Sequence, residues 1–589
     1  MGTSVKTCDA EGTSYLLTPC ATDFCLNGTC LVCAPGKTEC LDELTPGQCD
    51  VDGSQVKPLQ KCGVDGAKEV CHLGDCVPVC ATSLKEKSNV GCEYWAADLD
   101  NYFRIDASGE IHDAENAPYA IVVANVHDSL IAEVAVFTNE EVVAADSVAP
   151  GKLAVFPLVP RNVDGPLLEP LAYRITSDVP LVAYQFNPLL NSPVFSNDAS
   201  LLIPSGSLGN DYYVMSWEQG SEYNRGFVTV IATTSGKTTV KVTPSCTTLA
   251  SPDLPGCTKG QACDFQLNQF DVLNLETAVG GDDLTGTHIE SSKPIAVFAG
   301  NECGNVPSHG VCVEETCLDG GFPCSVDVEC PAICCCDHLE QQLLPVDSLG
   351  THYLAARTSP RNGEGEYWRI MAAEEDVVVT LTPEIYDVPK LNAGAYVDFE
   401  TNQSFEISAS GKIMVGQFLA GQNAPLPNVE ECVGASLVGD GKEGHCATSG
   451  NPCFYHSDCP VYCYFEQECE SLDQHLDAGI GDPTFILQVP VNSFRSDYTF
   501  LVPDTYASDN LIVVYPEGAW LSFDGGKANE YAGSALGSGE YRVLRTAISD
   551  GTHRLRSNMP FGVIVYGFDN YVSYGYPAGM AIELLSSRR

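Results

Sequence analysis

The chain has 589 residues, enough for several domains or one large repeat assembly, with 44% hydrophobic and 18% charged residues. Its formal net charge of −48 excludes a nucleic-acid partner and disfavours an anionic lipid surface, because like charges repel. The longest apolar runs have the length of strands, so we expect no membrane-spanning segment.

The cysteines are unevenly placed: twelve of the 29 lie within residues 8–92, none lies between Cys92 and Cys246, and none follows Cys469. Such clusters persist as disulfides only outside reducing compartments, so we expect an extracellular or cell-surface protein. Zinc is the competing interpretation, but only Cys30 and Cys33 have the C-x2-C spacing. The chain begins without an apolar export signal, and residues 1–92 are predicted to form a separate cysteine-rich disulfide module.

Beyond residue 92, short runs rich in Val, Ile, Tyr and Thr are bounded by Gly, Asn, Asp and Pro. This pattern predicts β-strands and an all-β fold with few helices. Residues 227–232, 238–243 and 377–382 are three such runs. The segment between the first two, Thr233-Thr-Ser-Gly-Lys237, predicts a hairpin loop.

Two alternating signatures divide residues 93–589 into four repeated antiparallel modules. One signature, P-x3-[LF]-x3-Y, begins at Pro204, Pro345 and Pro490. The other, a Ser-x-x-Pro turn before an apolar strand, begins at Ser177, Ser291 and Ser557, with a degenerate copy at Ser410-Gly-Lys-Ile413. The predicted modules cover about residues 94–190, 196–303, 336–422 and 481–580.

The first module lacks a strand with the P-x3-[LF] signature, whereas the C-terminal segment supplies an extra strand. A closed ring needs this arrangement in order to pair its edges. We therefore expect a propeller-like closed ring, with tandem β-sandwiches as the alternative. The ring would close where residues 574–580 pair with the first module near residues 94–99. The expected closing residues are Tyr574, Tyr576, Pro577, Met580, Tyr94 and Trp95.

Two cysteine-rich inserts, residues 303–336 and 432–469, follow the second and third modules. Both contain C-x6-C-x5-C-x3-C, which predicts small segments stabilised by disulfides. The cysteines are Cys317, Cys324, Cys330 and Cys334 in the first insert and Cys446, Cys453, Cys459 and Cys463 in the second. We expect Cys303 and Cys336 to pair at the base of the first insert. The loop that carries Cys246, Cys257 and Cys263 has an odd number of cysteines, so one of them is free or pairs elsewhere.

Several segments together resemble the IgGFc-binding family over about residues 94–585. That family is named for a domain that binds the Fc part of immunoglobulin G, and similar domains with cysteine-rich additions occur on bacterial surface proteins. The resemblance implies an extracellular binding or adhesion role, but neither immunoglobulin binding nor a residue-level site. It is carried by Tyr94-Trp-Ala-Ala-Asp-Leu-Asp100, Ala183-Tyr-Gln-Phe-Asn-Pro188, Ser196-Asn-Asp-Ala-Ser-Leu-Leu202, Leu284-Thr-Gly-Thr-His-Ile-Glu-Ser-Ser-Lys-Pro-Ile-Ala-Val-Phe298, Cys336-Asp-His-Leu-Glu-Gln341 and Ser573-Tyr-Gly-Tyr-Pro-Ala-Gly579.

The sequence contains no H-E-x-x-H, no G-x-S-x-G, no P-loop and no dinucleotide fingerprint. His338 lies close to Cys335 and Cys336, but bridged cysteines cannot act as nucleophiles. We therefore predict no enzyme and assign no catalytic, cofactor-binding or metal-binding residues. Whether a structural calcium ion is bound stays open, because three acidic turns offer oxygen ligands but none completes an EF-hand loop. These turns are Asp98-Leu-Asp-Asn101, Asp50-Val-Asp-Gly53 and Gly280-Gly-Asp-Asp283.

The leading functional hypothesis is a non-catalytic extracellular scaffold for binding or adhesion, with a protein or a glycoconjugate as its partner. The alternative is a structural subunit of an extracellular fibre, coat or matrix, in which an unpaired thiol joins copies of the chain. A hydrolase on a β scaffold is the third hypothesis, and the missing motifs argue against it.

Overall fold

The computed structural model describes residues 31–582, except 43, 64–66, 84–86, 106–110, 192–193, 195, 221–223, 309–335, 360, 362–363, 422–479 and 527–532. Within residues 1–30 and the two longest gaps, only the backbone of short strands is described. The side chains of the eight cysteines expected to bridge the two inserts therefore lie outside the described part of the structure. The short strands are β1 (Ser4–Cys8), β2 (Tyr15–Pro19), β3 (Cys25–Leu26), β4 (Thr29–Cys30), β26 (Cys312–Val313), β27 (Thr316–Cys317), β34 (Cys432–Val433), β35 (Gly444–Cys446), β36 (Pro452–Cys453), β37 (Tyr462–Tyr464) and β38 (Glu468–Glu470).

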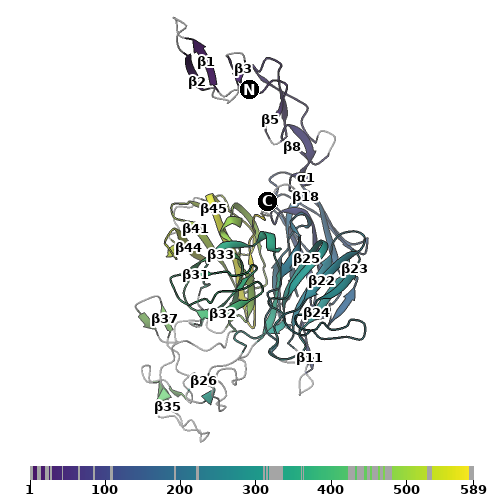
Figure 1. Cartoon of the computed structure of the whole chain (residues 1–589), viewed down its shortest axis with the longest axis vertical. Coiled ribbons are helices and arrows are strands. Elements are labelled where there is room, and N and C mark those ends of the chain that lie inside the picture. Colours follow the sequence, from purple (N-terminus) through teal and green to yellow (C-terminus); the bar gives the residue numbers. More distant parts are fainter. Residues whose placement is uncertain are drawn as a thin grey trace.

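Four antiparallel sheets form the body of the protein, and one long strand runs through each of them (Figure 1). This confirms the predicted all-β class with antiparallel repeated modules. The long strands are β18 (Tyr173–Asn187), β25 (His288–Gly304), β33 (Phe405–Leu419) and β45 (Gly551–Asp569). Among the described residues, the one α-helix is the short α1 (Val79–Ser83).

The first sheet adds to β18 the strands β10 (Gly91–Ala96), β13 (Tyr119–Asn125), β14 (Ala132–Thr138), β15 (Glu141–Val148), β16 (Leu153–Leu158) and β19 (Asp198–Leu201). The second adds to β25 the strands β17 (Leu167–Glu169), β20 (Gly209–Tyr213), β21 (Gly226–Ala232), β22 (Thr238–Thr243), β23 (Cys263–Leu267), β24 (Val272–Glu276) and β28 (Asp337–Gln342). A separate hairpin of β11 (Phe103–Ile105) and β12 (Ile111–Asp113) projects beyond the first sheet.

The third sheet adds to β33 the strands β29 (Gly350–Ala355), β30 (Glu366–Ala372), β31 (Val379–Thr382), β32 (Tyr396–Thr401) and β39 (Thr484–Leu487). The fourth adds to β45 the strands β40 (Arg495–Val502), β41 (Ser508–Pro516), β42 (Leu521–Phe523), β43 (Ser534–Leu536), β44 (Tyr541–Ala547) and β46 (Val572–Pro577).

Each long strand bends at the Ser-x-x-Pro signature, which was predicted to be a turn before a strand. In β18 the first half pairs with β10 and β14, and the second half pairs with β13 and β19. The Ser177 hydroxyl donates to the Val179 carbonyl (2.7 Å) and so closes the bend within the strand. Proline lacks an N–H donor, and a bulge tolerates it where a regular ladder does not.

The position of the bend shows that the degenerate copy in the third sheet was predicted one residue away from its true place. Ile413 lies opposite Gly350, as Leu181 lies opposite Gly91 in the first sheet. The residues that correspond to Ser177-Asp-Val-Pro180 are therefore Ala409-Ser-Gly-Lys412, one position earlier than predicted.

The predicted hairpin between residues 227–232 and 238–243 is wrong in its pairing. The first run is β21, which pairs with residues 295–301 of β25, beyond the bend. The second run is β22, which pairs with residues 288–291, before the bend. The connecting segment therefore crosses between the two halves of the sheet, because the bend separates the partners that a hairpin would keep together.

The P-x3-[LF] signature is a short 3₁₀ turn between two extended residues. The turns are Ser205–Ser207, Val346–Ser348 and Val491–Ser493, each preceded by the proline of the signature. The proline packs against the glycine at the start of the preceding sheet's opening strand. A Cβ on Gly209 would lie 2.4 Å from the Cβ of Pro345, and a Cβ on Gly350 would lie 2.3 Å from that of Pro490.

The tyrosine of this signature holds the bend of the long strand in place. Tyr353 accepts a hydrogen bond from Gly350 N (3.1 Å), and its hydroxyl donates to the Ile413 carbonyl just past the bend (2.6 Å). The corresponding hydroxyls donate to the same strand position in the other three sheets. These pairs are Tyr94 with Leu181, Tyr212 with Ile295 and Tyr498 with Phe561.

This equivalence shows that the first module does not lack an opening strand, as the sequence had suggested. Strand β10 takes that place, and Gly91-x2-Tyr94 matches Gly209-x2-Tyr212. Gly91 also packs against Pro204 as the other glycines pack against their prolines, with 2.4 Å between its added Cβ and that of the proline. Only the proline half of the signature is absent from the residues before β10 that the structure describes.

Replacing Tyr353 with Phe is expected to reduce the free energy of unfolding by about 1–3 kcal/mol, because the buried Gly350 N–H and Ile413 carbonyl lose their shared partner. The matched control is Tyr386→Phe, in the same module but 38% exposed, with an expected change within about 0.5 kcal/mol. Urea unfolding of both variants measures the difference. Equal effects would show that the hydroxyl does not hold the bend.

The last strands of the four sheets meet at the centre of the body. Strand β19 contacts β28, β28 contacts β39, β39 contacts β46, and β46 contacts β19. The four sheets are thus arranged in cyclic order around these strands, while each sheet also bends back on itself at its long strand. The central strands thus have cyclic contacts, but the sheets are bent and barrel-like, and the predicted propeller is not confirmed.

The N-terminal cysteine-rich segment extends from the body as an arm (Figure 1). It contains β5 (Thr38–Cys40), β6 (Pro46–Cys49), β7 (Val56–Pro58), β8 (Glu69–His72) and β9 (Asp75–Pro78). Its disulfides join Cys33 to Cys49, Cys40 to Cys71, Cys62 to Cys76 and Cys80 to Cys92. The base of the arm packs on the body, because Val70 and Val79 share the buried cluster of the first sheet. None of the described helices is long and apolar enough to cross a membrane.

Candidate functional site

A buried polar network lies where the four central strands meet. Gln341 of β28 places its Nε2 atom 3.2 Å from the Ala199 carbonyl, 2.8 Å from the Phe485 carbonyl and 3.0 Å from the Gly575 carbonyl. One side-chain amide thus contacts the last strands of the other three sheets. An amide has only two hydrogens, so the three carbonyls share them.

Two aspartates complete the central network. Asp198 of β19 accepts from the Thr484 hydroxyl (2.9 Å) and from the Glu340 backbone N–H (3.2 Å). Asp337 of β28 accepts from the backbone N–H groups of Asn197 (2.7 Å) and Ser573 (3.0 Å). Burial raises the pKa of both aspartates well above the usual range. These groups connect all four sheets, so their role is structural: they hold the sheets together.

The predicted ring closure is wrong in its partner strands. Tyr574, Tyr576 and Pro577 lie in β46, which pairs with β45. Tyr94 and Trp95 lie in β10, which pairs with β18. The closing segment does not pair with the first sheet at the predicted place, because β10 already fills the position that was thought to be empty.

The first and fourth sheets instead meet through the segment that precedes β10. Asn89 N donates to the Met580 carbonyl (3.1 Å), and Met580 N donates to Asn89 Oδ1 (3.0 Å). Ile582 N donates to the Lys87 carbonyl (2.7 Å). Deeper in the body, the ring of Tyr576 lies 4.9 Å from the ring of Tyr184 in β18. Arg495, which replaces the glycine of the other sheets, donates to Asn89 Oδ1 (3.0 Å) at this seam.

A cleft of about 220 Å³ opens at the same seam, between residues 125–128 of the first sheet and residues 552–554 of the fourth. Arg554 bridges it through ion pairs with Asp128 (2.6 Å) and Asp497 (2.8 Å). His553 contacts Asp524 (2.8 Å). Of these three pairs, Arg554–Asp128 crosses the seam, and the other two lie within the fourth module.

Strand β41, next to the closing strand β46, contains a carboxylate whose protonation depends on pH. Asp509 is 5% exposed, and Tyr574 donates a hydrogen bond to its Oδ1 atom (2.6 Å). Burial, with the nearby charges of Asp550 and Asp569, raises the pKa of Asp509 to about 6. The folded protein therefore binds a proton here more tightly than the unfolded chain does.

Because this pKa is raised, the stabilising contribution of Asp509 is present below about pH 4 and is lost as pH rises through about 6. We expect Asp509→Asn to be more stable than the wild type at pH 7 by about 1–3 kcal/mol, with the difference disappearing near pH 4. Urea unfolding at both pH values measures this. The exposed Asp264→Asn is the control, and a pH-independent effect of Asp509→Asn would contradict the argument.

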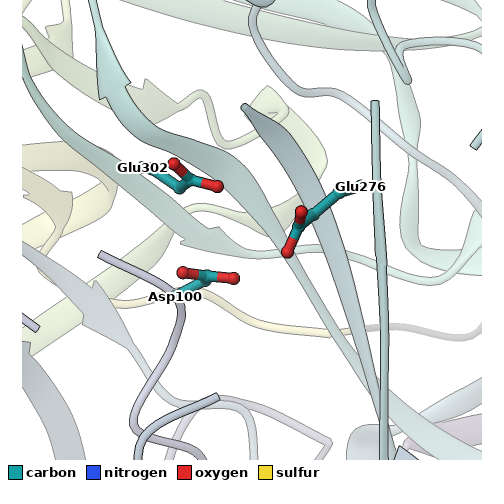
Figure 2. A group of neighbouring side chains, drawn as sticks. All are labelled: Asp100, Glu276 and Glu302. Atoms are coloured by element: carbon teal, nitrogen blue, oxygen red, sulfur yellow. The ribbon is translucent and has the colours of Figure 1, made fainter. Parts of the chain in front are cut away.

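Three buried carboxylates from the first two sheets point toward one another (Figure 2). Asp100 follows β10, Glu276 ends β24, and Glu302 lies near the end of β25, with exposed fractions of 4%, 1% and 9%. One ligand oxygen from each lies within 4.8 Å of the others. Among the described residues, this is the one group of at least three side chains with metal-ligating spacing.

The surroundings of this triad supply few positive groups. Asp100 accepts from Gly165 N (2.7 Å), and Asn274 Nδ2 lies 3.3 Å from a Glu276 oxygen. Arg225 is 3.7 Å from Glu276. Burial raises the pKa of Glu276 to about 7 and the pKa values of Asp100 and Glu302 well above their usual range. The donor set would suit a hard divalent cation, and without one the raised pKa values favour protonated carboxyl groups.

Of the acidic turns that the sequence singled out, only Asp98-Leu-Asp-Asn101 contributes to this triad. Asp283 forms an ion pair with Arg369 (2.6 Å), and Asp50 accepts from Ser54 N (2.9 Å) within its own turn. Sequence reasoning did not single out Glu276 and Glu302. The available signal was weak: Glu276 is the last residue of β24, and Glu302 follows the apolar run 295–299 within the long strand β25.

The cysteines of the body follow two patterns. Cys303 and Cys336 are bonded at the two ends of the first insert, and Cys257 is bonded to Cys263. Cys246 is the free cysteine among the described residues and is 3% exposed. Burial raises the pKa of its thiol to about 12, which leaves little reactive thiolate at neutral pH.

Comparison with known proteins indicates the family of this chain, which the geometry of the buried sites does not. A family model described as IgGFc binding protein matches residues 198–567, which contain the third sheet and most of the second and fourth sheets, but neither β17 nor β46. The human IgGFc-binding protein is 23% identical over 235 residues, which make up 40% of this chain and 4% of the human protein. The chain thus corresponds to a small part of that relative. Because the family model matches more than half of the chain, the protein belongs to the IgGFc-binding protein family.

Proposed function

We propose that this chain is an extracellular, non-catalytic binding protein whose partner is another protein. The observation that carries the proposal is the family match over residues 198–567, since the human relative is named for binding the Fc part of immunoglobulin G. The disulfides of the arm and body support an oxidising location.

The distribution of polar groups supports binding in preference to catalysis. The central network and the carboxylate triad are buried and hydrogen-bonded between sheets. A substrate would need access to such groups, whereas an assembled scaffold needs only the contacts between them. Binding would then use the outer surfaces of the sheets.

The Fc fragment of human immunoglobulin G is the first ligand to test, with the Fab fragment as its matched control. Surface plasmon resonance on the immobilised full chain should give saturable binding to a protein partner. Enzymatically deglycosylated Fc separates protein recognition from glycan recognition. Binding of a glycan array, with no binding to deglycosylated proteins, would replace the protein partner with a glycoconjugate.

A structural subunit of an extracellular fibre is the second candidate, and Cys246 bears on it. A thiol that joins copies of the chain must reach the surface, but the Cys246 side chain is buried. We expect iodoacetamide to leave Cys246 unmodified in the native protein and to alkylate it after denaturation. Peptide mapping by mass spectrometry measures this, and rapid modification of native protein would revive the fibre hypothesis.

A further inference from the structure

Strand β15 forms an open edge of the first sheet. Among the described strands, it pairs only with β14. It is eight residues long, and six of its side chains are exposed. Edge strands with unpaired backbone groups are able to pair with another chain, and proteins usually protect them.

The exposed side chains of β15 include two large apolar groups. Val142 is 52% exposed and Val143 is 46% exposed. The register passes from Val136–Ala144 to Phe137–Val142, so Val143 is the extra residue of a bulge. A bulge perturbs the ladder at one end of the strand, and residues 144–148 keep regular pairing with β14.

The corresponding edge of the second sheet is shorter and is tied by a disulfide. Its edge strand β23, which pairs with β22, has five residues. A disulfide ties its first residue, Cys263, to Cys257 in the preceding loop. Strand β15, at the edge of the first sheet, is longer than β23 and contains no cysteine that could tie it in this way.

Charge decides which occupant suits β15. Glu141 is exposed beside the valines, and Asp146 and Glu133, which lies opposite Ser147, are exposed further along the hairpin. A second copy of β15 would bring the same acids and another chain with a net charge of −48. Such a pair is disfavoured by repulsion, whereas lysine or arginine side chains would be attracted.

We propose that β15 is a docking edge for an extended segment of a partner protein, which joins the first sheet as an additional strand and carries both apolar and basic side chains. The inference rests on the proposed function as a protein-binding scaffold and names the chemistry of the partner. Backbone hydrogen bonds would provide much of the affinity, and the valines and acids would provide the selectivity.

Two synthetic nonapeptides test the proposal on the full chain: Lys-Val-Thr-Val-Lys-Val-Thr-Val-Lys and its counterpart with Glu in place of Lys. The lysine peptide should bind and slow hydrogen exchange in residues 141–148, and the glutamate peptide should do neither. Replacing Val142 and Val143 with Lys should weaken binding at least tenfold. The matched control replaces Val279 and Val378, which are 62% and 52% exposed in connecting segments outside the first sheet, with Lys.

Equal affinity of the two valine double variants, or protection elsewhere than β15, would overturn the proposal. Concentration-dependent protection of β15 without peptide would overturn it in favour of a second copy as the occupant. The Fc fragment is measured on the same variants. If Fc fails to bind but the lysine peptide protects β15, the docking edge is supported and the proposed function is contradicted. If Fc binds but the lysine peptide does not protect β15, the proposed function is supported and the docking edge is contradicted.

Discussion

Deleting residues 570–589 is expected to reduce the free energy of unfolding by on the order of 10 kcal/mol, and to expose the first sheet as well as the fourth. The deletion removes β46 and the segment that follows it. Burial of each large apolar side chain contributes about 1.5–3 kcal/mol, before the ladder with β45 is counted. The buried side chains removed include Val572, Tyr574, Tyr576, Ala578, Met580 and Ile582.

The effect should reach the first sheet because the lost segment contacts it directly. Strand β46 contacts β19, and Tyr576 packs against Tyr184. The two hydrogen bonds between Asn89 and Met580 disappear as well. Hydrogen exchange should therefore become faster in β18 and β19, far from the deletion in sequence.

Ser573→Ala is a matched control within the same strand. Its hydroxyl is buried and has no hydrogen-bond partner in the described part of the chain. Its loss should change the free energy of unfolding by less than about 0.5 kcal/mol. Unchanged protection of residues 173–201 in the deletion variant would mean that the sheets are stable independently of the closing strand.

The sequence predicted the strand content and the repeated modules because these depend on local patterns. The prolines before the 3₁₀ turns and the tyrosines at the bends recur at fixed spacing. The role of Tyr94 could also have been predicted, since Gly91-x2-Tyr94 repeats the spacing of Gly209-x2-Tyr212. Because the signature as predicted also included the proline, the first opening strand was not identified from the sequence.

The pairing of strands could not be predicted in the same way. A long strand that bends within a Ser-x-x-Pro segment gives its two halves different partners. Local sequence does not show whether such a segment ends a strand or bends it, because both positions tolerate proline. The hairpin between β21 and β22 was predicted wrongly for this reason.

The buried carboxylates show a second limit. Asp100 and Glu276 are far apart in sequence, and only the packing of the first sheet against the second brings them together. In a chain with 78 acidic residues, no local feature distinguishes these from solvated ones. The same holds for Gln341, whose three acceptors come from three different sheets.

Gln341→Met is the point substitution expected to have the largest effect on the body. Methionine matches the length of glutamine but cannot donate hydrogen bonds. Three buried carbonyls, of Ala199, Phe485 and Gly575, would lose their shared donor. Leaving buried acceptors unsatisfied costs about 1–3 kcal/mol each, so we expect a loss of about 3–5 kcal/mol when the remaining bonds relax.

The matched control is Gln266→Met in β23, because this exposed glutamine makes its hydrogen bond to Thr239 at the surface (2.9 Å). Its substitution should change the free energy of unfolding by less than about 0.5 kcal/mol. Hydrogen exchange distinguishes loss of the central contact from a local defect in β28. If Gln341 holds the four sheets together, exchange in β19, β39 and β46 should become faster together. If exchange becomes faster only in β28, the Gln341 amide stabilises only its own strand. The central strands are then held together by their apolar contacts alone.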